Sequence, residues 1–186
     1  MEADWEFEID PQAPIIDAAW QGLVDLRQHP ARIHEIDETA LTPGLAGALL
    51  RLNRPASPVW TAKCDAWVPE AMDPVELDTP AGEAAYAQAC YLDLLPSEGI
   101  DWSGPATVEV FCRRLTAALQ TIPARNCRTD LVVRRAILHG GQETLGITAY
   151  LTACGATEEG AVAALAAALA ALADSCCGLQ LGEQSA

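Results

Sequence analysis

The stretch PVWTAKCDAWV, residues 58–68, decides how the chain is organised, because the spacing of apolar residues changes from helical to two-residue at this point. Apolar and polar residues alternate along it, which is typical of a β-strand with one face toward a core. The alternation puts Lys63 and Asp65 on one face and Trp60 and Cys64 on the other. We therefore expect Cys64 to pack inward beside Trp60, with the two charged side chains on the opposite side.

A boundary precedes this strand. The segment NRPASP, residues 53–58, holds two prolines and separates a mainly helical portion from the alternating portion. We expect a strand and helical extension over residues 1–55 and a sheet domain over 56–186, joined in one compact unit. In the extension, the patterns predict a strand over 5–9 and helices over 14–28 and 42–53.

The residues after the first strand repeat one order of elements. Alternating or apolar runs predict further strands over 84–96, 128–140 and 144–155. A helix follows Ser103, and Thr157 caps a long alanine-rich helix. The expected fold class is α+β: a mainly antiparallel four-stranded sheet in ββαββα order, with helices packed on one face. The other face then needs a cover, either the N-terminal helices or another subunit.

The order of elements over residues 57–178 resembles that of small trimeric proteins of the chorismate-mutase-like kind. The resemblance concerns element order, and the chain matches no sequence motif of that group. It therefore implies an assembly of several copies, and it assigns no role to any residue.

The charge of the chain restricts its partners. It carries 26 acidic residues against 11 Lys and Arg, a formal net charge of −15. Nucleic acids and anionic lipids need clustered basic residues that displace counterions. We therefore expect neither nucleic acid nor membrane as a partner.

The seven cysteines show no metal-binding pattern, because no CxxC pair occurs and the three histidines are not spaced as ligands beside them. They are Cys64, Cys90, Cys112, Cys127, Cys154, Cys176 and Cys177. In a reducing compartment such residues are small buried hydrophobes. We predict neither a metal site nor a cofactor.

Two segments bear on localisation. The N-terminal sequence MEADWEFEID is acidic and lacks the apolar core of a secretory signal. The longest apolar run, residues 161–173, is mostly alanine and is too short to span a bilayer. We expect a cytoplasmic protein.

Lys63 and Asp65 are the first candidate site residues. Two residues apart on a strand, they point to the same face and can form a charge pair. One interpretation is a substrate-binding pair, or a lysine made nucleophilic by burial. The other is a solvated surface pair of little energetic value.

Arg134 and Arg135 are the second candidates, because they stand next to each other in an apolar strand and must point to opposite faces of the sheet. A guanidinium on a covered face needs a carboxylate, an anionic ligand or a subunit interface. One hypothesis is a site for a small carboxylate or phosphate compound held by bidentate contacts. The alternative is internal pairing with acids such as Asp65, Asp93 or Glu109. Both faces are apolar around their arginine, so the pattern does not say which arginine lies inside.

Tyr150 completes the candidate ligand-binding residues. It shares a strand face with Thr148 and could line a pocket there, although sheet packing explains both residues equally well. The acidic segment 69–83 reads as a solvated loop, or as a lid over a basic pocket that contains Arg134 or Arg135.

The sequence holds no phosphate loop and no nucleophile or metalloprotease motif. Our leading hypothesis is a cytosolic accessory or small-ligand-binding protein that acts through self-assembly or a protein partner. The first alternative is a small enzyme that acts on a carboxylate- or phosphate-bearing metabolite, with an arginine that clamps the anion. The second is thiol-based metal handling. Whether the protein is an enzyme stays open at this point.

Overall fold

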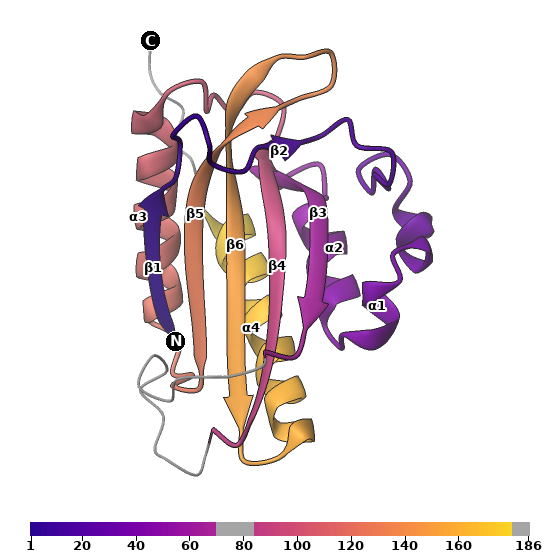
Figure 1. Ribbon diagram of the computed structural model, residues 1–186, viewed down its shortest axis with the longest axis vertical. Coiled ribbons are helices and arrows are strands. Elements are labelled where there is room, and N and C mark those ends of the chain that lie inside the picture. Colours follow the sequence, from indigo (N-terminus) through magenta and orange to yellow (C-terminus); the bar gives the residue numbers. More distant parts are fainter. Residues whose placement is uncertain (70–83, 180–186) are drawn as a thin grey trace.

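The computed structural model describes residues 1–69 and 84–179, which form a mixed α+β fold with one large sheet. The sheet has six strands in the order β1-β5-β6-β4-β3, with β2 paired to the same strand as β1. Helices α3 and α4 lie behind the sheet in Figure 1, so the opposite face points toward the viewer. The strands are β1 (Glu2–Phe7), β2 (Ile16–Asp17), β3 (Val59–Trp67), β4 (Tyr86–Pro96), β5 (Cys127–Ile137) and β6 (Glu143–Gly155).

The sheet is mostly antiparallel, as expected, but it has six strands where we predicted four. Strands β3, β4, β6 and β5 are joined by antiparallel pairs. The two further strands come from the N-terminal segment and run parallel to β5, with Glu2 opposite Arg128 and Phe7 opposite Val133. This pairing covers the outer edge of β5, whose backbone groups would otherwise lack ladder partners.

Two long helices cover the rear face of the sheet. The described helices are η1 (Pro30–Glu35), α1 (Glu38–Leu41), α2 (Leu45–Leu52), α3 (Pro105–Gln120) and α4 (Glu158–Gly178). The cap predicted for α4 is confirmed, because Oγ1 of Thr157 accepts the backbone N–H of Gly160 at 3.0 Å. The N-cap of α2 is Gly44. Gly44 has a φ of +87°, and a Cβ on it would lie 2.9 Å from Cα of Ala166 in α4.

The helix predicted over residues 14–28 is wrong. This segment contains β2 and a series of turns. Its burial follows a spacing of two: Ile16 and Ala18 are buried, whereas Ile15 is 45% exposed. Because the segment pairs with β5, tertiary contacts override the local helical pattern.

The chain has a second, smaller apolar cluster on the front face. The main core lies between the sheet and the helices, and the second one forms where the N-terminal segment crosses the sheet. The buried residues of the second cluster are Ile16, Ala18, Trp60, Ala62, Leu95 and Ala136.

Trp60 therefore lies on the face opposite to Cys64, which packs against the main core, and our expectation that they pack side by side is wrong. The register of β3 against β4 shifts between Thr61 and Lys63. Such a bulge inserts one residue and reverses the alternation of side chains on either side of it.

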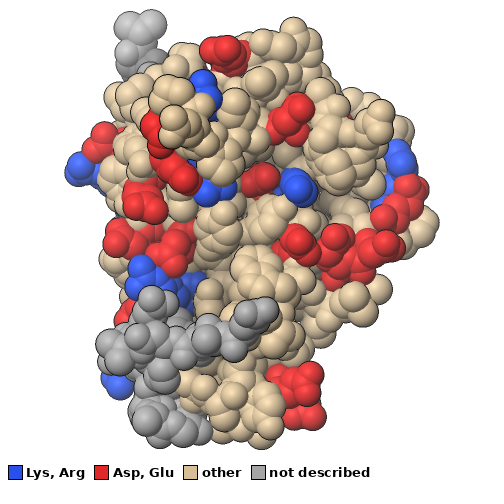
Figure 2. Space-filling view, in the orientation of Figure 1, with Lys and Arg blue, Asp and Glu red and all other residues tan. Residues whose placement is uncertain are grey.

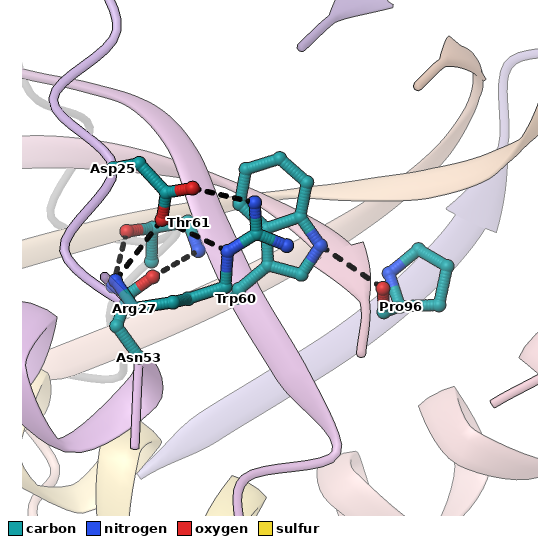
Figure 3. Close-up of polar contacts among 6 residues, drawn as sticks. All are labelled: Asp25, Arg27, Asn53, Trp60, Thr61 and Pro96. Atoms are coloured by element: carbon teal, nitrogen blue, oxygen red, sulfur yellow. Dashed lines mark hydrogen bonds and ion pairs between the residues drawn. The ribbon is translucent and has the colours of Figure 1, made fainter. Parts of the chain in front are cut away.

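A polar cluster fastens the N-terminal segment over this end of the sheet (Figure 3). The guanidinium carbon of Arg27 lies 3.7 Å from the centroid of the Trp60 ring. Asp25 holds this guanidinium through two hydrogen bonds of 2.9 and 2.8 Å, and the bonded arginine lowers the pKa of the Asp25 carboxyl. On the other side, Nε1 of Trp60 donates to the carbonyl of Pro96 at 3.0 Å. The N-terminal segment thus covers this end of the front face.

Helix α4 is the one described helix whose length and composition would allow it to cross a membrane. A core helix meets the same criteria, and α4 packs its apolar residues against the sheet and α2. It is also joined to α2 by an ion pair between Arg51 and Asp174.

Thiol titration is expected to find one fast-reacting cysteine in the native protein. Cys177 is exposed, while Cys64 is half-buried and the other five are buried. Burial raises the pKa of Cys64, Cys90 and Cys112 to about 12, which suppresses the reactive thiolate at neutral pH. Titration with an aromatic disulfide reagent should give one thiol per native chain and seven in denaturant, and Cys177→Ser should remove the native signal. Rapid reaction of further thiols would contradict the burial described above.

Candidate functional site

A pocket of about 380 Å³ lies on the front face of the sheet, beside the N-terminal segment. We call it the sheet pocket. Its polar side chains come from β3, β4, β5 and β6: Lys63, Tyr91, Asp93, Arg134, Thr148 and Tyr150. Residues 14–17 and Trp20 form its remaining wall. In the space-filling view of this face, acidic and basic side chains lie close together near the centre (Figure 2).

The strand register brings these side chains together. Lys63 is opposite Asp93, which is opposite Thr148, so these three form one row across β3, β4 and β6. The next row along holds Tyr91 opposite Tyr150. Residues in one row have Cβ atoms roughly 4.5–5.5 Å apart on neighbouring strands. Distant parts of the chain therefore form one continuous polar surface.

Arg134 organises the hydrogen bonds on one side of the pocket. Its Nε and Nη2 donate to Oε2 of Glu8 at 2.9 and 2.6 Å. Its Nη1 donates to Oγ1 of Thr148 at 3.3 Å and to the hydroxyl of Tyr150 at 3.1 Å. Thr148 in turn donates to Oδ1 of Asp93 at 2.6 Å. In this series of hydrogen bonds the hydroxyl of Thr148 has a defined orientation, because it accepts from Arg134 and donates to Asp93. The hydroxyl of Tyr150 accepts from Arg134, and its own proton has no partner among the described residues.

The charges in the pocket are shifted by burial and by their neighbours. Burial raises the pKa of the Asp93 carboxyl, opposed by the hydrogen bond from Thr148 and by the nearby Arg134 and Lys63. The hydrogen bond with Tyr91 raises the pKa of Lys63, and burial raises the pKa of Tyr91. Lys63 is therefore an ammonium at neutral pH, and Tyr91 is a neutral phenol.

Of the five residues proposed from the sequence, three line the sheet pocket: Lys63, Arg134 and Tyr150. Asp65 lies one pleat beyond Lys63, opposite Tyr91, and its Oδ1 accepts the backbone N–H of Ala66 at 2.8 Å. It acts on Lys63 through its charge and is not part of the pocket wall.

Arg135 lies on the opposite face of β5 from Arg134. Its Nη2 donates to the carbonyl of Pro11 at 3.4 Å, and its Nε is buried with no hydrogen-bond partner among the described residues. Arg134 therefore lines the sheet pocket, whereas Arg135 alternates with Leu131 and Val133, which belong to the main core on the side that the helices cover. Arg134 forms an internal ion pair, as the alternative hypothesis predicted. Its partner is Glu8 rather than Asp65, Asp93 or Glu109.

Two pocket residues on β4 were not proposed as site residues from the sequence. Tyr91 and Asp93 are two residues apart on a strand, so the alternation places them on one face together. That signal was present in the sequence, whereas the contact of Glu8 with Arg134, 126 residues away, depends on the parallel pairing of β1 with β5.

The described residues show no metal centre. Within 1–69 and 84–179, no group of three or more His, Cys, Asp and Glu side chains is placed to hold a metal ion. The acidic segment that we interpreted as a loop or lid falls at residues 70–83, outside the described part of the chain.

Comparison of the chain with models of protein families, with curated proteins and with solved structures finds no match. The chemistry of the sheet pocket must therefore be argued from its own residues.

Proposed function

We propose that this chain is a small-ligand-binding protein and that its ligand occupies the sheet pocket. The observation that carries the proposal is a polar network with unused hydrogen-bonding groups at a concave surface. Such convergent polar groups in a preformed hollow, next to aromatic rings, are typical of small-molecule sites. The neighbouring rings belong to Trp20, Tyr91 and Tyr150.

The arginine serves this site as a support rather than as an anion clamp. Four of the five N–H groups of a guanidinium are engaged in Arg134, two by Glu8 and one each by Thr148 and Tyr150. A bidentate contact with a carboxylate would require Glu8 to leave. Lys63 is therefore the better cationic contact for a ligand, because its ammonium has three N–H donors and forms no ion pair within 4.0 Å among the described residues.

Binding is better supported than covalent catalysis. Lys63 is protonated, and the thiol of Cys64 lies on the other face of β3 with its pKa raised to about 12 by burial. Neither residue is an activated nucleophile. Asp93 is the group on which the alternative of a small enzyme rests, because burial raises the pKa of its carboxyl and so favours the protonated form of a general acid.

The proposal is tested by screening a library of small metabolites against the full chain by thermal shift and native mass spectrometry. We expect compounds that raise the melting temperature, and we expect Lys63→Met to weaken their binding about 10- to 100-fold, the loss of one charge-assisted hydrogen bond. Arg113→Met is the matched control, because Arg113 lies on the outer surface of α3 and pairs there with Glu109. Hits that bind Lys63→Met as tightly as the natural chain would place the site elsewhere and refute the proposal.

The accessory role through self-assembly or a protein partner is part of the same proposal. The sheet pocket lies at the surface of the described part of the chain, where a second chain has access to its mouth. The native mass spectrum of this screen also gives the number of chains in each ligand-bound species.

A further inference from the structure

We propose that the ligand of the sheet pocket is a small zwitterion that carries an ammonium and a carboxylate group a few ångströms apart, as an α- or β-amino acid does. The inference rests on the function proposed above and names the chemical class of the ligand. It follows from the arrangement of opposite charges in the pocket and from the hydrogen-bonding groups that its network leaves unused.

Opposite charges lie next to each other in the pocket. Lys63 and Asp93 are direct neighbours in the register of β3 and β4. Among the ion pairs formed by the described residues, none joins these two within 4.0 Å. Asp17 adds a second carboxylate on the wall formed by the N-terminal segment. A ligand in the pocket therefore meets both signs of charge within the length of a small molecule.

The carboxylate of the ligand has two donors available. Lys63 has three N–H donors and forms no ion pair within 4.0 Å among the described residues. The hydroxyl of Tyr150 accepts from Arg134, so its own proton is free to point elsewhere. Both residues line the pocket, and a carboxylate accepts from several donors at once.

The ammonium of the ligand has acceptors in the same pocket, on Asp93 and Asp17. Oδ1 of Asp93 accepts from Thr148, and the structure shows no hydrogen bond to Oδ2 from the described residues. Oδ1 of Asp17 accepts the backbone N–H of Ala19 at 2.7 Å, which leaves its Oδ2 available in the same way. A cationic group bound at Oδ2 of Asp93 also favours the ionised form of this carboxyl, which burial otherwise disfavours.

A ligand with one charge fits this pocket less well. An anion that approaches Lys63 is repelled by Asp17 and Asp93, in a chain whose net charge is already −15. A cation that approaches the carboxylates is repelled by Lys63. Like charges repel more strongly at a partly buried site than in water, so each mismatch opposes the gain from the matching contact. A zwitterion satisfies both signs.

The experiment uses two matched sets of compounds, titrated into the full chain by calorimetry. The first set is L-phenylalanine, 3-phenylpropanoate and 2-phenylethylamine. The second is L-leucine, 4-methylpentanoate and 3-methylbutylamine. In at least one set the amino acid should bind ten-fold or more tightly than either compound with one charge. The absence of such a preference from both sets, or failure of both amino acids to bind, would overturn the inference.

Two variants assign the ends of the ligand. In Asp93→Asn, the amino acid should no longer bind more tightly than the compound that carries only the carboxylate. In Lys63→Met, the amino acid should no longer bind more tightly than the compound that carries only the amine. Arg113→Met should leave both preferences unchanged, and equal preferences in all three variants would overturn the assignment. Library compounds that depend on Lys63 while neither amino acid binds would refute the zwitterion alone. A library without any pocket ligand would refute the proposed function as well.

Discussion

Arg134→Met is expected to lower the free energy of unfolding by about 2 kcal/mol, a value for a partly buried charge whose partners lose their donor. The side chain of Arg134 is 13% exposed, and its removal leaves Glu8, Thr148 and Tyr150 without their common donor. Its hydrogen bonds with Glu8 and Tyr150 outweigh burial and raise the pKa of Arg134, so the folded state favours the charged form. Because the Glu8 side chain is 39% exposed, water compensates part of the loss.

Arg135→Met is the matched control for this variant. Arg135 makes one long hydrogen bond, to the carbonyl of Pro11, and its buried Nε has no partner among the described residues. Removing such a group should change the free energy of unfolding by less than about 0.5 kcal/mol, as for most residues outside a hydrogen-bonded network. Urea unfolding followed by tryptophan fluorescence measures both values. Equal losses in the two variants would mean that Arg134 does not organise the front face.

Phe111→Ala is expected to lower the free energy of unfolding by about 3–5 kcal/mol, the usual range for a large aromatic residue removed from a core. Phe111 is a residue of α3, is 0% exposed and belongs to the main core between this helix and the sheet. Its ring centroid is 5.1 Å from that of Trp102, which is itself 2% exposed. The substitution removes this aromatic contact and leaves a cavity that two fixed layers cannot close.

Val110→Ala tests whether this loss comes from burial. Val110 is the residue before Phe111 on the same helix and is 46% exposed. Its truncation should change the free energy of unfolding by less than about 1 kcal/mol. Guanidinium unfolding gives both values, and the slope of the transition should be the same in both variants. A loss below 2 kcal/mol in Phe111→Ala would show that the helix layer is loosely packed.

Arg134→Met and Phe111→Ala measure the stability contributions of two different layers of the molecule. Phe111 reports on the rear core that supports the sheet, and Arg134 on the polar network at its front. The sheet pocket takes its polar groups from four strands of one sheet, which hold them at defined spacing. A binding site built on strands changes little in shape when a ligand enters.

The local spacing of apolar residues was sufficient to predict most strands of the sheet and the helices that cover it. Alternation over residues 58–68 predicted β3, and Thr157 as a capping residue predicted the start of α4. These features depend on residues close in the sequence, and the energies that decide them are local: the alternation of a strand and the capping of free N–H groups. Alternation also predicted that Thr148 and Tyr150 share a face, and both contact Arg134.

Local periodicity failed where a distant partner decided the conformation. Residues 14–28 carry apolar side chains near helical spacing, yet Ile16 is held in a strand by Ala136 and the segment crosses the front face. The bulge in β3 has the same origin, since it depends on the register against β4 and reverses the face on which Trp60 lies. Neither feature has a signal within a window of ten residues.

The sequence by itself determined the mixed α+β class, the positions of the main strands and the presence of two adjacent arginines on opposite faces of one strand. Which arginine faces the pocket was decided by the tertiary structure alone. Both faces of β5 are apolar around their arginine, so the local pattern is symmetric. The symmetry is broken by β1, which pairs in parallel with β5 and brings Glu8 to Arg134, and by β6, whose register places Thr148 and Tyr150 beside the same guanidinium. A buried or half-buried charge is stable only where such partners converge, and their convergence depends on contacts between residues far apart in the chain.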